Sequence, residues 1–427
     1  MSLSLRTLQR SAASILFALS TLPAIAGELG STRPERVDMS SERLQRLDSF
    51  LERAIAQGRI PGAVILIARD GEVAHYKALG LADRASGRAM RQDDIFRIYS
   101  MTKPIVSVAL LMLYEEGHFQ LDDPLEMYLP SFRDVQVFAG TDAAGNMILE
   151  APRRKPTIHD AFRHTLGVSA GSGNTPPEQL YREKGILVNQ LSSLSQQMDL
   201  LGQVPLLYHP GERWLYGYGH DVQAALVEHF SGMPLDRFLQ ERLFGPLRMV
   251  DTGYDKGRSA RGRIATLHDV PDTPPANPAV DMRTTTYDRF ADVPMGTLGL
   301  WSTAMDYARF AQMLLNEGEL DGVRILGEKT VELMAQNHLP PAIGTLAEGN
   351  GTPGIGYGLG VSVVLDSAEA GNLASPGTYG WTGAATTRFL IDPEEDLVAI
   401  FMAQQWPYDS RLLSEFETLV YQALVDD

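Results

Sequence analysis

Ser100-Met101-Thr102-Lys103 stands directly before residues 104–116, PIVSVALLMLYEE, and this stretch decides how the chain is organised. The second part is apolar nearly all round, which is typical of a helix buried at the centre of a lobe. At helical spacing, residues i and i+3 share a face, so the Lys103 amine can reach the Ser100 hydroxyl. Desolvation penalises an ammonium, and a neutral amine can accept a serine proton. Ser100 is therefore a candidate nucleophile.

Toward the N-terminus, the pattern predicts a helix and a hairpin. Residues 40–57 place Leu44, Leu47, Leu51 and Ile55 on one helical stripe, and Gly58 can end that helix. Residues 63–67 read as a buried strand, which Asp70-Gly71 turns into a second strand at 72–76. The sequence therefore places strands ahead of the buried helix.

Toward the C-terminus, two helices are expected at about 219–231 and 303–316. Two strands follow at 386–391 and 397–402, and a last helix carries an apolar side. Strands at both ends with helices between them predict one sheet built from both termini, with a helical lobe inserted. The expected division is a sheet region at 34–98 and 290–427 and a helical region at 99–289, with the active site at their junction.

Three stretches rich in Pro, Gly and Asp, at 139–156, 171–178 and 255–297, read as loops. Long loops often form lids or substrate walls, although a mobile surface segment is an equal alternative. The 255–297 loop is expected to shape the alcohol or acyl pocket.

Composition excludes several classes of function. The 427 residues hold 37 Lys and Arg against 53 Asp and Glu, for a formal charge of -16, and no cysteine. Such acidity argues against nucleic-acid binding and against anionic membrane surfaces. Without cysteine there can be no disulfide, thiolate metal site or cysteine nucleophile.

The first 26 residues have the layout of a secretory signal peptide. Arg6 and Arg10 precede an apolar run at 15–19, and Ala24-Ile25-Ala26 offers a small-residue cleavage site. A membrane anchor is the alternative, but the run is too short to span a bilayer. The protein is therefore expected to be exported without a stable membrane anchor and, in a host with two membranes, to be periplasmic after cleavage near Ala26.

Other candidate motifs are weaker. Gly167-Val168-Ser169-Ala170-Gly171 matches the nucleophile elbow Gly-x-Ser-x-Gly, which needs a strand before the serine and a helix after it. Here a helical pattern precedes and a Gly- and Pro-rich stretch follows, so Ser169 is disfavoured. The triplet at 172–174, Ser-Gly-Asn, is read as loop. His159 and His164 are five residues apart and would face different sides of a helix, so no metal is expected.

The chain as a whole resembles the class C β-lactamase superfamily and, within it, the family VIII carboxylesterases. The resemblance rests on separate blocks in the right order: SMTKP with EEGHFQLDDP, HTLG, PGERWLYGYGHD, FSGMPLDRFLQERLFGPLRMVDTGY, TLGLWSTAMDYARFAQMLL and GWTGAATTRFLIDP. It implies an α/β (α+β) fold of the β-lactamase and penicillin-binding-protein type. An antiparallel sheet from both termini is flanked by helices and carries an inserted all-helical region.

By this resemblance, Ser100 is acylated and Lys103 is its proton partner. The family's Tyr-x-Asn element also supplies a tyrosine that moves protons, and this chain offers Tyr216 and Tyr218. Counting from the Pro-Gly at 210–211 favours Tyr216, whereas a polar residue two positions on, His220, favours Tyr218. We predict Tyr218 as the catalytic tyrosine and Tyr216 as an aromatic wall.

The family's Lys-Thr-Gly element appears here as Trp381-Thr382-Gly383, which is expected to line the substrate, and the alternative for Trp381 is a packed strand residue. By analogy, the N–H groups of Ser100 and Ala384 form the oxyanion hole. A lysine at the place of Trp381 would hold a substrate carboxylate, and such a charged hydrogen bond is worth roughly 1.5 to 3 kcal/mol. An indole offers apolar surface and one N–H instead. Neutral acyl esters are therefore expected, with slow cephalosporin turnover compatible with the same geometry.

The leading hypothesis is a serine carboxylesterase that needs no cofactor and acts on short- to medium-chain acyl esters. A β-lactamase or D,D-peptidase is the first alternative. A non-catalytic penicillin-binding or sensor protein that is acylated without turnover is the second.

Overall fold

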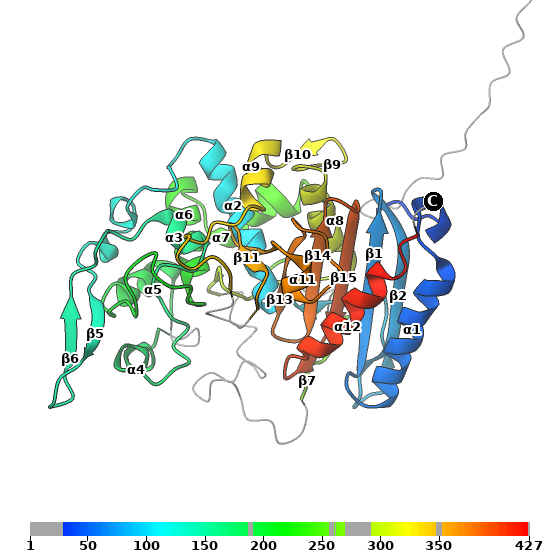
Figure 1. Ribbon diagram of the computed structural model, residues 1–427, viewed down its shortest axis with the longest axis horizontal. Coiled ribbons are helices and arrows are strands. Elements are labelled where there is room, and N and C mark those ends of the chain that lie inside the picture. The colour runs from blue at the N-terminus through cyan, green and yellow to red at the C-terminus, as the bar shows by residue number, and fades with distance from the viewer. Residues whose placement is uncertain are drawn as a thin grey trace, which may run out of the picture.

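A computed structural model describes residues 29–186, 191–255, 260, 262–269, 292–346 and 352–425. Figure 1 shows two regions side by side, a helical one and a sheet with helices against it. The predicted signal peptide at 1–26 and most of the 255–297 loop lie outside the described residues, so both expectations stay predictions. Within the described part of the chain, no helix is long and apolar enough to cross a membrane.

The main sheet has eight antiparallel strands in the order β11-β12-β13-β14-β15-β1-β2-β3. Their bounds are β1 Gly62–Arg69, β2 Glu72–Asp83, β3 Arg88–Ala89, β11 Ile355–Tyr357, β12 Ser362–Val364, β13 Tyr379–Gly383, β14 Thr387–Asp392 and β15 Leu397–Ala403. The ends of the chain meet inside it, because β1 pairs with β15 from Ala63 opposite Ala403 to Arg69 opposite Leu397. The prediction of one antiparallel sheet built from both termini is confirmed.

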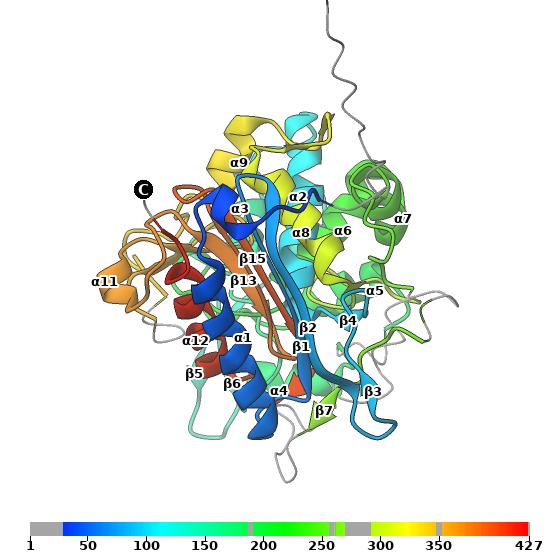
Figure 2. The ribbon, with the colours of Figure 1, turned by 90° about the vertical axis from the view of Figure 1, so that its right-hand side faces the viewer.

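Helices cover both faces of this sheet. Side chains alternate along a strand, and Ile65 and Ile67 pack with the helices α1 (Ser41–Ala56) and α12 (Ser410–Tyr421). Val64 and Leu66 join the larger core, which also contains α8 (Ala304–Leu315). Figure 2 shows α1 and α12 on one side of the sheet and α8 on the other. Burial on both faces explains why β1 is an unbroken apolar run.

The N-terminal helix begins and ends where local sequence signals place it. Ser40 caps α1, and its hydroxyl accepts the backbone N–H of Arg43 at 3.2 Å. Leu44, Leu47 and Leu51 form the buried stripe. Gly58 follows the end of the helix with φ 76°, a conformation that glycine adopts without strain.

The centre of the helical region is α2 (Thr102–Glu115), which is buried at every position from Thr102 to Leu113. It packs against α6 (Gly219–Ser231). The other helices are α3 Ile158–Phe162, α4 Pro176–Glu183, α5 Leu194–Leu201, α7 Leu235–Leu239, α9 Glu328–Met334 and α11 Ser367–Ala370. Short helical turns are η1 Pro34–Val37, η2 Tyr99–Met101, η3 Leu125–Met127, η4 Pro130–Phe132 and η6 Gln240–Phe244.

Further strands form two-stranded pairs outside the main sheet. They are β4 Phe96–Arg97 with β8 Trp301–Ser302, β5 Val137–Thr141 with β6 Met147–Glu150, β7 His268–Asp269 with β16 Gln405–Trp406, and β9 Glu319–Leu320 with β10 Val323–Arg324.

Two of the predicted loops contain regular structure. The 139–156 stretch holds the β5–β6 hairpin, whose turn is built by Asp142 Oδ1 accepting the N–H groups of Ala144 and Asn146 at 2.9 Å each. The 171–178 stretch contains the start of α4, where Thr175 and Glu178 form a capping box. The inserted region is therefore helical apart from short strands, and the boundaries at 34–98, 99–289 and 290–427 stay predictions.

Candidate active site

Ser100 sits in a tight turn at the head of α2. The short helix η2 contains it, and the first hydrogen bond of that turn runs from the Met101 N–H to the Ile98 carbonyl at 3.0 Å. Tyr99, directly before it, has φ 44°, which is uncommon for a bulky residue and costs conformational energy. Tyr99 is buried, so the surrounding core holds this conformation. The turn presents the partly exposed Ser100 above the buried helix.

Lys103 lies one helical turn after Ser100 and is fully buried. Its Nζ donates to Ser100 Oγ at 3.1 Å and to the Thr297 carbonyl at 2.8 Å. The structure therefore brings together the two residues of the Ser-x-x-Lys tetrad at helical spacing. Thr297 begins the block TLGLWSTAMDYARFAQMLL, but the sequence analysis assigned no role to its carbonyl.

The tyrosine that reaches Ser100 is Tyr216. Its hydroxyl donates to Ser100 Oγ at 2.8 Å, and its ring centroid lies 4.5 Å from Lys103 Nζ. Ser100 Oγ thus contacts an amine and a phenol at once. This is the central geometric feature of the site.

Tyr218, the tyrosine predicted for that place, lies elsewhere, and the assignment is corrected. It is 6% exposed at the N-terminus of α6, and its ring stacks on Tyr181 with centroids 6.0 Å apart. Burial and then nearby Asp221 raise its pKa above the ordinary value for tyrosine. The polar-residue argument was misleading because the path of the chain around Gly217, rather than the residue two positions on, decides which ring faces Ser100.

Gly217 sets the path of the chain because its backbone lies close to the backbone of Val168. A Cβ at this position would lie 2.1 Å from the Val168 carbonyl oxygen, so no other residue fits without a shift. Just before it, the Leu215 N–H donates to the His164 carbonyl at 2.8 Å. Residues 215–217 are therefore laid against residues 164–168.

The predicted Trp381-Thr382-Gly383 element forms the other side of the site. Trp381 on β13 is partly exposed, and its ring centroid lies 5.8 Å from that of Tyr216 and 5.2 Å from that of Tyr357. A Cβ on Gly383 would lie 2.4 Å from the Ile98 carbonyl, so the end of β13 touches the backbone two residues before Ser100. Trp381 is thus both packed on one side and accessible beside Tyr216.

Ala384 follows directly after β13 in the turn to β14. The hydrogen bond of this turn runs from the Thr386 N–H to the Gly383 carbonyl at 3.1 Å. In the turn that contains Ser100, the first hydrogen bond is donated by the N–H of Met101 and not by that of Ser100. Neither turn uses the N–H group that the resemblance assigns to the oxyanion hole.

A buried carboxylate supports the lysine, and the sequence analysis missed it. Asp221 Oδ1 accepts the Thr297 N–H at 2.7 Å, and its Oδ2 accepts Gln197 Nε2 at 3.0 Å. Burial raises the pKa of Asp221, while these hydrogen bonds and Lys103 act in the opposite direction. Asp221 fixes the segment whose carbonyl receives Lys103. An aspartate in the first turn of an apolar helix was the available signal.

Two buried histidines lie beside this group. The rings of His164 and His220 have centroids 4.8 Å apart, and that of His164 is also 4.8 Å from Tyr216. Burial lowers the pKa of both well below the ordinary value, and nearby Lys103 lowers them further. Both rings are therefore neutral.

The competing candidates have structural roles. Ser169 is 2% exposed, and its hydroxyl donates to Glu178 Oε1 at 2.8 Å, so it caps local structure rather than facing Ser100. His159 contacts His338, whereas His164 lies among the aromatic rings. Among the residues that the structure describes, no group of three or more His, Asp or Glu could hold a metal ion.

A serine hydroxyl held between a buried lysine amine and a tyrosine hydroxyl, at the head of a buried helix beside an antiparallel sheet, defines a serine hydrolase of the β-lactamase and penicillin-binding-protein fold. Comparisons with known proteins agree. The family model described as Beta-lactamase matches residues 47–421, so the chain belongs to the β-lactamase family.

Relatives narrow the class further. An uncharacterized protein of Mycobacterium tuberculosis is 33% identical over 372 residues, covering 82% of this chain and 87% of its own. Esterase EstB of Burkholderia gladioli is 30% identical over 363 residues, covering 81% and 86%. The solved structure of EstCE1, a hydrolase with promiscuous acyltransferase activity, has 26% identity and a TM-score of 0.73 over 89% of this chain and 98% of its own. The protein is a family VIII carboxylesterase-like serine hydrolase.

Proposed function

We propose that the protein is a carboxylesterase that hydrolyses short- to medium-chain acyl esters through an acyl-enzyme on Ser100. One observation carries the proposal: Ser100 Oγ lies 3.1 Å from Lys103 Nζ and 2.8 Å from the Tyr216 hydroxyl. Nucleophilic catalysis by a hydroxyl requires an adjacent group that takes its proton, and two such groups contact Ser100 Oγ.

In the acylation step, Ser100 Oγ attacks the ester carbonyl carbon, and its proton passes to the pair formed by Tyr216 and Lys103. The tetrahedral adduct collapses, the bond to the alcohol oxygen breaks, and the pair returns the proton to that oxygen. In deacylation the same pair takes a proton from water, the resulting hydroxide attacks the acyl carbon, and Ser100 leaves with the proton. The proton that leaves with the alcohol is replaced by the one taken from water, so the three residues return to their starting state after each turnover.

The oxyanion of each tetrahedral adduct is assigned to the N–H groups of Ser100 and Ala384. Both groups are left unused by the turns that contain them. Removal of one such donor typically costs about 3 kcal/mol of transition-state stabilisation. The contact of Gly383 with the Ile98 carbonyl supports this assignment, because it holds the two turns together.

Trp381 supports a preference for neutral acyl groups. Its partly exposed ring lies against Tyr216 and Tyr357, so the surface beside Ser100 is aromatic rather than cationic. Apolar area removed from water contributes about 25 cal/mol per Å², which favours an acyl chain over a carboxylate at this wall. Hydrolysis of β-lactams by the same acyl-enzyme route would be slower, because no lysine stands at this position to hold their carboxylate.

The deciding experiment compares the wild-type rates on p-nitrophenyl butyrate and on a chromogenic cephalosporin. We expect the ester to react much faster, and a faster lactam reaction would overturn the proposal in favour of a β-lactamase. Ser100→Ala should abolish ester turnover, whereas Ser169→Ala, the matched serine control, should retain it. Intact-mass measurement after ester addition separates turnover from a sensor, which would keep a permanent acyl adduct.

A further inference from the structure

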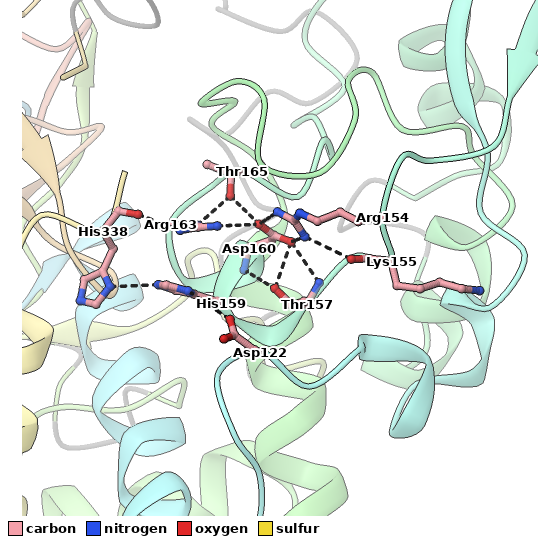
Figure 3. Close-up of polar contacts among 9 residues, drawn as sticks. All are labelled: Asp122, Arg154, Lys155, Thr157, His159, Asp160, Arg163, Thr165 and His338. Atoms are coloured by element: carbon pink, nitrogen blue, oxygen red, sulfur yellow. Dashed lines mark hydrogen bonds and ion pairs between the residues drawn. The ribbon is translucent and has the colours of Figure 1, made fainter. Parts of the chain in front are cut away.

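A buried carboxylate lies at the centre of a polar cluster some way along the chain from the residues assigned to catalysis (Figure 3). Asp160 of α3 is 0% exposed, and the Arg154 guanidinium donates to both of its oxygens, from Nη1 to Oδ2 at 2.6 Å and from Nη2 to Oδ1 at 2.7 Å. Arg163 at 3.1 Å and the Thr165 hydroxyl at 2.8 Å also donate to its Oδ1. The N–H of Thr157 at 3.0 Å and its hydroxyl at 3.1 Å donate to Oδ2.

These contacts keep Asp160 ionised in spite of its burial. Burial alone would raise its pKa, but Arg154 and Arg163 offset it, and the pKa lies below the ordinary value. A buried charge with this many donors is a rigid hub, since losing one partner leaves a costly unpaired group. Capping a helix of five residues uses only Thr157, so the bonds to Arg163 and Thr165 need another explanation.

Those two bonds fix a turn at residues 163–165. In that turn His164 has φ 57°, a left-handed conformation that a non-glycine residue adopts only when its surroundings enforce it. The Thr165 hydroxyl bridges the turn, because it donates to Asp160 and accepts Arg163 Nε at 3.0 Å. Asp160 therefore determines which way His164 points.

The turn at residues 163–165 holds the stretch that carries Tyr216, which has no regular secondary structure. The His164 carbonyl accepts the Leu215 N–H at 2.8 Å, and the Thr165 carbonyl accepts the Gly211 N–H at 2.8 Å. The ring of His164 packs on the ring of Tyr216, with centroids 4.8 Å apart. Arg154 itself lies against Gly211, where an added Cβ would be 2.3 Å from its guanidinium. Each contact ends within five residues of Tyr216.

We infer that Asp160 is a positioning residue for the esterase reaction, which places the Tyr216 hydroxyl at Ser100 Oγ through Thr165, Arg163 and the left-handed turn at His164. The inference rests on the proposed function of Tyr216. The hydrogen bonds of Asp160 are to residues 154–165 and not to Ser100, so it acts through the loop that it holds.

A second arm of the same hub reaches the opposite aromatic wall. Arg163 Nη1 donates to the His338 carbonyl at 2.8 Å, and the His338 ring contacts the His159 ring at 2.9 Å between Nδ1 and Nε2 (Figure 3). The next residue, Leu339, packs with Trp214 and Tyr357 behind Trp381. Asp160 thus ties the segment before Tyr216 to the segment behind Trp381.

A double-mutant cycle tests the inference on the full chain, with p-nitrophenyl butyrate as the probe. Asp160→Asn should lower kcat about tenfold or more in the wild-type background, because small misplacements of a reacting group cost this much. In the Tyr216→Phe background the same substitution should change kcat by no more than about twofold, since the group it positions is gone. An equal loss in both backgrounds would overturn the inference and leave the role of Tyr216 standing. If Tyr216→Phe alone kept full activity, the proposed function would fail instead.

Two further variants keep the test decisive if Asp160→Asn does not fold. Thr165→Val removes the bridging hydroxyl at nearly constant shape and should lower kcat, whereas Thr165→Ser retains the hydroxyl and should keep kcat near wild type. Equal activity of these two variants contradicts the inference. Asp392→Asn is the matched control. Asp392 is also 0% exposed and accepts the Tyr421 hydroxyl at 2.8 Å. It stands at the C-terminal end of β14, the opposite end of the strand from Thr387. It should alter stability without altering kcat.

Discussion

The two sides of the active site are built by different means. Ser100 and Lys103 share one helical turn at the head of α2, so their contact follows from the pitch of a helix. Tyr216 belongs to a segment without regular secondary structure, whose position is set by bonds to residues 164 and 165. The comparison teaches that a catalytic distance can come from local geometry on one side of a reacting atom and from distant contacts on the other.

The largest expected effect comes from changing Lys103, on the side of the site that α2 builds. Lys103→Met retains much of the buried volume but removes the amine from Ser100 Oγ and from the Thr297 carbonyl. We expect kcat on p-nitrophenyl butyrate to fall by about 10³-fold or more, as for the loss of a catalytic proton carrier. Pre-steady-state release of p-nitrophenol checks that acylation is the step lost. Substantial acylation in this variant would show that Tyr216 alone activates the serine.

The next largest effect is expected at Tyr216, on the side of the site that has no regular secondary structure. Tyr216→Phe removes only the hydroxyl that lies 2.8 Å from Ser100 Oγ and should lower kcat by about 10²- to 10³-fold. Tyr218→Phe is the matched control, since it removes the same atom two residues away, and should change kcat by no more than about threefold. Steady-state kinetics of both variants decide between them. The reverse order of effects would restore Tyr218 as the catalytic tyrosine.

These two tyrosines also show which features of the site could be predicted from the sequence and which could not. The buried run of β1, the stripe of α1 and the spacing of Ser100 and Lys103 are local patterns, and each was predicted correctly. The choice of Tyr216 depends on Gly217 meeting the Val168 carbonyl, a contact between segments far apart in the chain. The same holds for Asp221, which accepts the N–H of Thr297 from a distant part of the chain. The partners of Asp160 lie within six residues of it, but the contacts of its turn with the segment of Tyr216 are again between distant parts of the chain.

A smaller effect is expected at the sheet edge. Trp381→Lys places a cation where the aromatic wall now lies, so kcat/KM for p-nitrophenyl butyrate should fall while that for an ester with a carboxylate on its acyl group should rise. A charged hydrogen bond is worth roughly 1.5 to 3 kcal/mol, which corresponds to about a tenfold to hundredfold change in the ratio. Trp381→Leu separates lost aromatic area from added charge. An unchanged ratio in Trp381→Lys would show that substrates do not reach this wall.

The smallest effect concerns stability at acid pH and comes from His159 of α3. Burial, followed by Arg163, lowers the pKa of His159 to about 3 from the usual 6.5; His338 and Arg154 lower it further, and Asp160 opposes them. Below pH 6.5 the unfolded chain therefore binds a proton that the folded protein refuses, and the free energy of unfolding falls as the pH drops toward 3.

His159→Gln should consequently reduce the loss of stability between pH 7 and pH 5. The expected change is about 1 kcal/mol, less than the full shift implies because the ring is partly accessible and solvent screens it. Urea unfolding at the two pH values measures it, and the exposed His118→Gln serves as the control. An identical pH dependence in wild type and His159→Gln would show that His159 is protonated in the folded state near pH 6.

The pairing of β1 with β15 has a consequence for how the protein acquires its structure. Ala63 finds Ala403 only after the whole intervening chain has been made, so the central pair of the sheet is a contact of very long range. Such contacts close late, because the entropy of a large loop must be lost before they form. The turn that presents Ser100 meets β13, near the C-terminal end, at Gly383. We therefore expect the site around the nucleophile to be completed late in folding, and a chain without its C-terminal strands to carry the serine without a site.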